Sequence, residues 1–217
     1  EGEAGYKAVV ERAVTQLGQH VHSLYAAGAR RIVMLNLPDL GRTPIVLQNT
    51  TYVPDYLVDN DAARRMELAR RLTELTRYHN QVLATAVEQL RGELPESEII
   101  LVDTFGHFER LYGGDDNAPL QPADFGYDPA ALAETLSYEE QQLTLLRRCY
   151  NGSYYQGTLD PDSMCPNPDQ ALFWDSVHPT TLTQCWQAWK VGNDLAEAGW
   201  IRPLPDQGTY LGWCRTI

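Results

Sequence analysis

The stretch from Phe173 to Thr180, which reads FWDSVHPT, holds an acid and a base at a spacing that suits hydrolytic chemistry. Asp175 and His178 stand three residues apart, directly before an apolar stretch with helical periodicity. An aspartate at this spacing can hold a histidine ring by its Nδ1–H, so that Nε2 faces a serine hydroxyl. We therefore expect His178 to act as general base and then as general acid, with Asp175 orienting its ring.

The third member of such a triad, a nucleophilic serine, has no recognisable position in the 217 residues. Ser176 lies between the acid and the base, but no glycine elbow or following helix start presents its hydroxyl, which favours a turn role. The same setting is missing at the other serines, which are Ser23, Ser97, Ser137, Ser153 and Ser163. The sequence thus predicts an incomplete triad.

Other polar residues have both a functional and a structural interpretation. Asn36 could donate its side-chain amide to an acyl oxyanion, but its place in an Asn-Leu-Pro loop favours a structural role. Asp103 and His107, spaced i and i+4, could join Asp175 and His178 in a metal site. For Asp103 and His107 we favour ordinary strand-end and surface roles, so no metal site is expected.

Composition limits the classes of function. A length of 217 residues suits one domain with an ample core, and a hydrophobic fraction of 43% is ordinary for a globular protein. The formal net charge of −12 argues against nucleic acid, because phosphates attract a basic surface. No apolar run reaches the roughly 18 residues of a spanning helix, so no transmembrane segment is expected.

All four cysteines, Cys149, Cys165, Cys185 and Cys214, lie in the last third of the chain. None forms a Cys-x-x-Cys pair, which argues against a zinc knuckle. The even count favours two disulfides and an oxidising compartment, with four separate buried thiols as the alternative. Of the three connectivities open to four cysteines, we favour the local one, Cys149 with Cys165 and Cys185 with Cys214.

Hydrophobic spacing predicts two long helices separated by a short strand. The first helix covers about 3–27 and ends at Gly28, with a core face of Val10, Val14, Leu17, Val21 and Leu24. The second covers about 61–91, with a core face of Leu68, Leu72, Leu75, Val82, Ala86 and Leu90. Apolar runs at 32–35 and 99–102 are typical of strands buried on both faces.

Shorter helices are predicted at 105–111 and 182–198, while turn formers dominate 112–172 except for a helix at 138–148. The order helix, strand, helix, strand, helix predicts an α/β fold with a parallel sheet. Two strands are too few for such a sheet, because parallel strands need neighbours and burial on both faces. We therefore expect residues 1–217 to be the C-terminal portion of a single larger α/β domain.

Four segments, taken in order, resemble the SGNH hydrolases, also called GDSL esterases and lipases. They are Ile32–Pro44 (IVMLNLPDLGRTP), His79-Asn80 in the long helix, Val102–Phe105, and Phe173–Thr180. The last segment is the specific one, since the family's final block supplies its catalytic Asp and His. The likeness is closer to secreted bacterial lysophospholipases and haemolysin-like members than to plant ones.

The resemblance implies a flavodoxin-like, three-layer α/β/α fold and a seryl acyl-enzyme mechanism that needs no metal or organic cofactor. The family's Gly-Asp-Ser block, its oxyanion glycine and its oxyanion asparagine are not found here. We therefore expect a missing N-terminal segment, as this chain's partner, to supply the catalytic serine. This chain would contribute Asp175 and His178 and would be inactive alone.

The expected complete enzyme is a secreted or periplasmic hydrolase of lipid or lysophospholipid esters. Two other classes of function remain open. A metal-dependent hydrolase would use Asp103, His107, Asp175 and His178, and a non-catalytic binding module would keep an acyl pocket without a nucleophile. Labelling by a fluorophosphonate separates the serine hydrolase from both, because only an activated serine reacts with it.

Overall fold

The computed structural model describes residues 3–47, 62–111, 149–150, 164–165, 168 and 171–214. A two-stranded parallel sheet stands at its centre, formed by β1 (Arg31–Leu35) and β2 (Glu98–Val102), which pair in register along their whole length. This pairing confirms the predicted strands and the α/β class. Within the described ranges no further strand joins the sheet, so the wider sheet of a flavodoxin-like fold is not confirmed.

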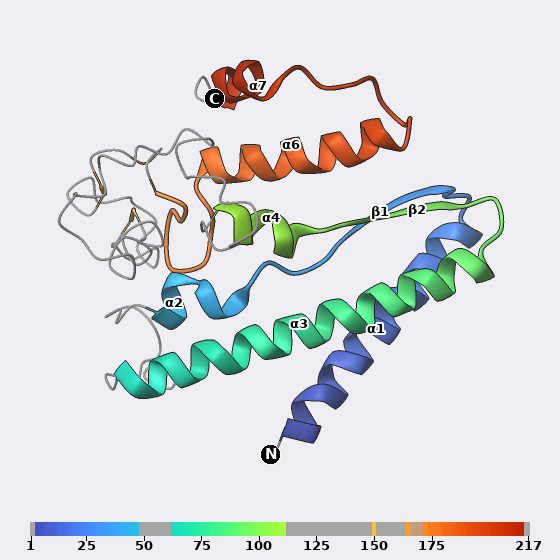
Figure 1. Cartoon of the computed structure of the whole chain (residues 1–217). Coiled ribbons are helices and arrows are strands. Elements are labelled where there is room, and N and C mark those ends of the chain that lie inside the picture. The colour runs from blue at the N-terminus through green and yellow to red at the C-terminus, as the bar shows by residue number, and fades with distance from the viewer. Residues whose placement is uncertain are drawn as a thin grey trace.

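Helices lie on both sides of the strands (Figure 1). On one side are α1 (Glu3–Ala26) and α3 (Ala62–Glu93), and on the other is α6 (Thr181–Glu197). The predicted short helix after β2 is present as α4 (Thr104–Leu111). The helix predicted at 138–148 lies outside the described residues.

Three short helices had not been predicted. A 3-10 helix, η1 (Leu40–Arg42), and a single turn, α2 (Pro44–Leu47), follow β1. Near the C-terminus α7 (Gln207–Cys214) has the sequence QGTYLGWC, in which two glycines interrupt any apolar stripe, so periodicity could not reveal it. None of the described helices is long and apolar enough to cross a membrane.

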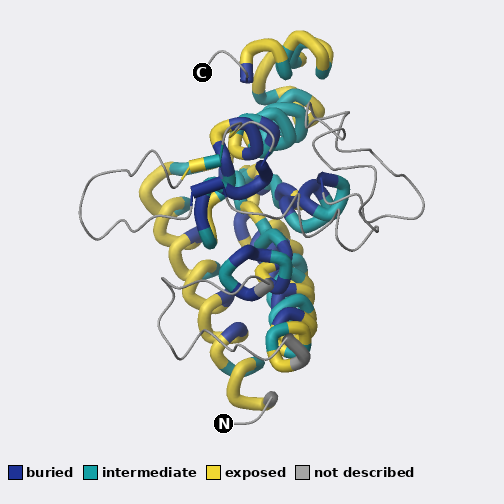
Figure 2. The backbone as a smooth tube through the Cα atoms, turned by 90° about the vertical axis from the view of Figure 1, so that its left-hand side faces the viewer, coloured by how far each residue is buried: buried dark blue, intermediate teal, exposed yellow. Residues whose placement is uncertain are grey.

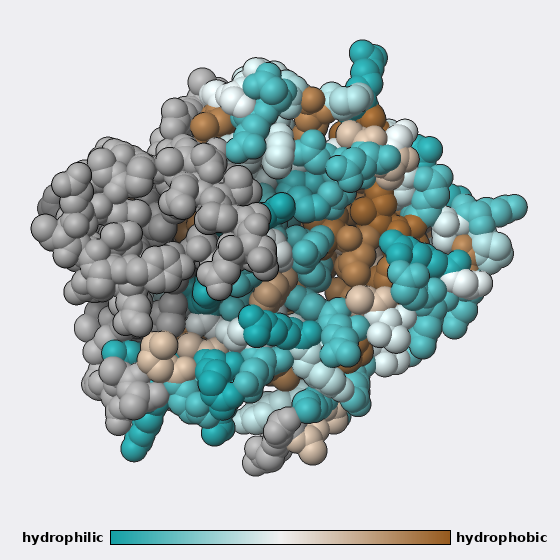
Figure 3. All heavy atoms as spheres, viewed as in Figure 1, coloured by the Kyte–Doolittle hydropathy of each residue, from teal (hydrophilic) through white to brown (hydrophobic). Residues whose placement is uncertain are grey.

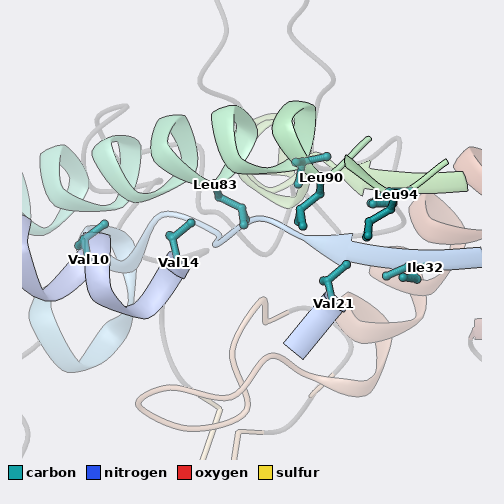
Figure 4. Close-up of a cluster of buried hydrophobic side chains, with 9 residues drawn as sticks. Val10, Val14, Val21, Ile32, Leu83, Leu90 and Leu94 are labelled. Atoms are coloured by element: carbon teal, nitrogen blue, oxygen red, sulfur yellow. The ribbon is translucent and has the colours of Figure 1, made fainter. Parts of the chain in front are cut away.

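The first core lies where α1, α3 and the two strands meet, and it is almost entirely aliphatic (Figure 4). It consists of Val10, Val14, Val21, Ile32, Leu83, Val87, Leu90, Leu94 and Ile99. Full burial of each such side chain contributes about 1.5–3 kcal/mol to folding. Figure 2 shows the resulting asymmetry of the long helices, which are buried along one side and exposed along the other.

Three residues expected on core faces are exposed instead: Leu17 at 40%, Leu24 at 50% and Leu68 at 37%. Leu17 and Leu24 flank the valine stripe of α1, and that stripe supplies the buried α1 residues of this core. Near Leu68, α3 buries the smaller Ala69. Spacing alone predicts how wide an apolar face is, but which part of that face is covered depends on its neighbours.

The loop after β1 is fastened to α3 by side chains to which the sequence analysis gave no such structural role. Asn80 Nδ2 donates to the Leu37 carbonyl at 2.8 Å, and its Oδ1 accepts from the Leu37 N–H at 3.0 Å. The buried Asp39 carboxylate accepts from the Gly41 N–H at 2.9 Å. Gly41 packs so tightly on α3 that a Cβ there would fall 2.2 Å from the Ala69 carbonyl oxygen.

The second core joins α4, α6, α7 and the segment that precedes α6. It consists of Phe108, Leu111, Leu172, Phe173, Leu182, Trp186 and Cys214. A disulfide between Cys185 and Cys214 ties α7 to α6, and a second one joins Cys149 to Cys165. Both predicted pairings are therefore confirmed, and the second core anchors the chain directly before the candidate catalytic residues.

Candidate active site

Asp175 and His178 lie at the tip of a short hairpin formed by residues 172–180, which we call the dyad hairpin. Its arms meet at an antiparallel bridge between Phe173 and Pro179. Inside this bridge the N–H of Trp174 donates to the carbonyl of His178 at 2.8 Å. The turn between the acid and the base is thus closed by the backbone on either side of it.

The sequence explains why the hairpin ends where α6 begins. Pro179 disfavours helical geometry at the preceding residue, which keeps His178 in the extended arm. Thr180 is the N-cap of α6, and its hydroxyl accepts from the Thr183 N–H at 3.3 Å and donates to the Ala171 carbonyl at 2.9 Å. The position of the base is therefore tied to the start of a helix.

The acid and the base are in direct contact, as the sequence predicted. His178 Nδ1 lies 2.7 Å from Asp175 Oδ2, while Asp175 Oδ1 accepts from the N–H groups of Val177 at 2.8 Å and His178 at 2.7 Å. The Asp175 side chain is only 10% exposed, whereas that of His178 is 73% exposed. A buried carboxylate held by two backbone donors thus fixes a ring that faces outward.

The tip of the hairpin has a contact of its own. Ser176 lies in the bend between the acid and the base, and its carbonyl accepts from the N–H of Ile45 in α2 at 2.9 Å. The loop after β1, which Asn80 holds to α3, therefore also supports the turn that carries the dyad.

Asn36 and Asp103 connect the carboxyl ends of the two strands. Asn36 Nδ2 donates to Asp103 Oδ1 at 2.8 Å, and its own Oδ1 accepts from the Phe105 N–H at 2.9 Å. Asp103 Oδ1 also accepts from the Gly106 N–H at 3.0 Å. Both side chains thus have the structural roles favoured above, at the edge of the sheet where ligands commonly bind in α/β proteins.

His107 is 1% exposed, so the surface role expected for it is wrong. It lies on the face of α4 that also buries Thr104, Phe108 and Leu111. Burial, together with the positive charges of Arg110 and Lys190, lowers the pKa of its imidazole to about 4. The described residues contain no group of three or more His, Cys, Asp or Glu side chains that could hold a metal ion.

Tyr150 and Trp174 form a contact that sequence reasoning missed. Their rings stack with centroids 5.6 Å apart and an interplanar angle of 5°, and Tyr150 is 1% exposed. Neither residue was assigned a role in the sequence analysis. No local signal could link two aromatic residues so far apart in the chain.

A pocket with a volume of about 600 Å³ lies between α1 and α3, and its lining includes Thr15, Gln19, Tyr78 and Gln81. None of its lining residues belongs to the dyad hairpin. We therefore do not assign it to the substrate of the Asp175–His178 pair.

Residues 2–189 match the model of the family described as GDSL-like lipase/acylhydrolase. Among curated relatives, two GDSL esterase/lipases of Arabidopsis thaliana are 26% identical over 168 residues and 23% identical over 184 residues. These alignments cover 76% and 81% of this chain and 39% and 42% of the relatives. A GDSL esterase/lipase of Medicago truncatula is 24% identical over 173 residues, or 80% of this chain and 41% of the relative.

The chain thus spans about two fifths of the length of the curated relatives it matches. These relatives are plant proteins, so the expected closer likeness to bacterial members is not confirmed. The family model covers most of the chain, and its match ends within α6, beyond the dyad hairpin. The chain therefore belongs to the GDSL-like lipase/acylhydrolase family.

Proposed function

We propose that the protein is a serine-dependent carboxylic ester hydrolase in which this chain supplies the acid and base of the triad. The observation that carries the proposal is the 2.7 Å contact between His178 Nδ1 and the buried Asp175 carboxylate. Membership of the GDSL-like lipase/acylhydrolase family supports the same class of reaction.

The geometry suits the proton transfers of ester hydrolysis. The Asp175 carboxylate holds the proton on Nδ1, so Nε2 of His178 can take the serine proton while the serine oxygen attacks the ester carbonyl. The imidazolium, stabilised by the carboxylate, then gives this proton to the leaving alkoxide. Water hydrolyses the acyl-enzyme with the same base, which returns the proton to serine.

We further infer that the serine comes from a polypeptide segment outside these 217 residues, covalently joined or associated. Among the described residues β1 pairs with β2 alone, and Leu35 at the end of β1 is 46% exposed. Figure 3 shows hydrophobic atoms at the surface between α6 and α3, in the region of the two strands. Parallel strands are normally buried, so this surface supports an added strand.

The order of elements indicates where that strand would pair. The crossover from β1 to β2 runs through α3, and crossovers between parallel strands are nearly always right-handed. Because α1 lies on the same side of the sheet as α3, a strand leading into α1 would pair with β1 along the edge opposite β2. It would also approach the apolar flank of α1, where Leu17 and Leu24 are exposed.

Lipid or lysophospholipid esters are the substrates we propose, and the word lipase in the relatives' names supports an acyl substrate. A secreted or periplasmic location is proposed because the two disulfides require an oxidising compartment. The proposed mechanism uses protein side chains throughout and assigns no role to a metal.

The test measures hydrolysis of p-nitrophenyl esters by the complete polypeptide and by its His178→Ala, Asp175→Asn and His20→Ala variants. His20 lies exposed on α1 and serves as the control. We expect His178→Ala to lower kcat by roughly four orders of magnitude or more, Asp175→Asn by somewhat less, and the control to match wild type. Equal rates for wild type and His178→Ala would refute the assignment.

Labelling distinguishes the competing functions. A fluorophosphonate should label a serine in the complete polypeptide, whereas the 217-residue chain alone should be neither labelled nor active. Activity that a chelator abolishes, without any labelling, would indicate a metal-dependent hydrolase. The lack of both turnover and labelling in the complete polypeptide would indicate a binding module.

A further inference from the structure

Two short segments that precede Asp175 in the sequence are attached to the arm of the dyad hairpin that carries it. They are Cys149-Tyr150 and Met164-Cys165, which we call the disulfide clip. Besides the disulfide, an antiparallel bridge pairs Tyr150 with Met164, and the Cys165 N–H donates to the Cys149 carbonyl at 2.8 Å. The clip is thus closed by the backbone and by a covalent bond.

The clip contacts the hairpin through consecutive backbone groups. The N–H of Cys149 donates to the carbonyl of Phe173 at 2.9 Å, and the N–H of Tyr150 donates to that of Trp174 at 2.5 Å. These acceptors belong to the two residues directly before Asp175. The other arm of the hairpin is anchored differently, through Thr180 at the start of α6.

Ring stacking adds a second contact at the same place. The Tyr150 ring is buried and lies parallel to that of Trp174, so the two rings can exclude water from the arm of the hairpin before Asp175. Cys149 is also 1% exposed. The arm that carries the acid is therefore held on its outer edge by buried groups, while the base at the end of the turn stays exposed.

We propose that the disulfide clip positions the catalytic dyad, with Tyr150 as its main positioning residue. The proposal rests on the proposed function of Asp175 and His178, and it adds a structural requirement that the dyad itself does not reveal. Without the clip, the arm would keep its bridge to Pro179 but lose the donors and the ring that fix its outer edge. The Asp175 carboxylate would then no longer hold the His178 ring in one orientation.

The first experiment uses the complete polypeptide and needs no activity. Histidine side-chain ¹⁵N NMR distinguishes the Nδ1–H from the Nε2–H tautomer of His178, and the contact with Asp175 favours Nδ1–H. We expect wild type and Tyr150→Phe to keep this tautomer, because phenylalanine retains the stacked ring. Tyr150→Leu, which keeps a buried apolar side chain without the ring, should shift the spectrum toward the mixture seen in unconstrained histidine.

The two disulfides provide a matched control. Cys149→Ser with Cys165→Ser removes the bond of the clip, while Cys185→Ser with Cys214→Ser removes a bond of the same kind between α6 and α7. Each double substitution should lower the stability of the protein, but only the loss of the Cys149–Cys165 bond should change the His178 tautomer. If both pairs leave the tautomer unchanged, or both change it equally, the clip is a general stabiliser and the proposal is overturned.

The second experiment measures kinetics in the complete polypeptide. A displacement of about 1 Å in a catalytic group can cost about 100-fold in rate, so Tyr150→Leu should lower kcat roughly 10- to 100-fold with little change in KM. Tyr150→Phe, which keeps the stacked ring, should have the wild-type kcat. If His178→Ala is inactive but Tyr150→Leu has the wild-type kcat, the clip proposal fails alone; if His178→Ala is active, the proposed function fails.

Discussion

Because His107 is buried, the free energy of unfolding should depend on pH in the range where this histidine titrates. Replacing His107 should remove that dependence. Its pKa is lowered from 6.5 to about 4, first by burial and then by the charges of Arg110 and Lys190, while Asp103 opposes the shift. The substitution His107→Gln removes the titrating group and keeps a polar side chain of similar length.

The sign follows from which state binds the proton more tightly. In the unfolded chain the imidazole binds a proton near pH 6.5, whereas in the folded protein it does so only near pH 4. Between these values the unfolded state holds more protons, so the free energy of unfolding falls as the pH falls. The contribution of His107 is present above pH 6.5 and is lost by about pH 4.

The magnitude follows from the size of the shift. A shift from 6.5 to about 4 corresponds to about 3 kcal/mol at 1.36 kcal/mol per pH unit. Integrated from pH 7 to pH 4.5, the expected loss is about 2 kcal/mol. This loss is a large fraction of the free energy of unfolding of a typical domain, which is about 5–15 kcal/mol.

The assay is urea unfolding of wild type and His107→Gln from pH 7 to pH 4.5, with both disulfides intact. Any constant cost of the substitution cancels when each protein is compared with itself at pH 7. We expect wild type to lose about 2 kcal/mol more than the variant over this range. His20→Gln, at an exposed site on α1, is the control and should follow wild type. Parallel curves for wild type and His107→Gln would show that folding does not weaken proton binding by His107.

Two further predictions concern the loop after β1. Gly41→Ala should destabilise the protein by about 1–3 kcal/mol, because the new Cβ would fall 2.2 Å from the Ala69 carbonyl oxygen. In Gly18→Ala, in α1, the new Cβ meets nothing within 4 Å, so this control should stabilise the protein by about 0.5–1 kcal/mol. Urea midpoints that move in the same direction would contradict this. Asn80→Ala removes both hydrogen bonds to the Leu37 backbone and should cost about 1–3 kcal/mol, while Gln81→Ala, at an exposed neighbouring position, should cost under 0.5 kcal/mol. Equal urea midpoints for these two variants would show that the loop does not depend on Asn80.

The elements that the sequence predicted correctly are those with local signals. Hydrophobic spacing revealed α1 and α3, continuous apolar runs revealed both strands, and the helix predicted at 182–198 corresponds to α6. The contact between Asp175 and His178 spans three residues, so it too could be predicted from local sequence. The favoured disulfides joined cysteines that are neighbours in the sequence.

What the sequence did not reveal depends on contacts between distant residues. His107 was assigned to the surface because of its polar residue type, but it shares one face of α4 with Phe108 and Leu111, and α6 packs on that face. Leu17 belongs to the apolar face of α1, yet the described residues leave it 40% exposed. The stacking of Tyr150 on Trp174 joins segments whose sequences carry no sign of each other.

The order of the two disulfides along the chain has a consequence for biosynthesis. The bonds close consecutive loops, with partners 16 and 29 residues apart, and neither loop encloses a cysteine of the other. When such a chain passes N-terminus first into an oxidising compartment, Cys165 is the next cysteine to appear after Cys149, and Cys214 is the next after Cys185. Among these four cysteines, oxidation in order of appearance would therefore join each one to its native partner.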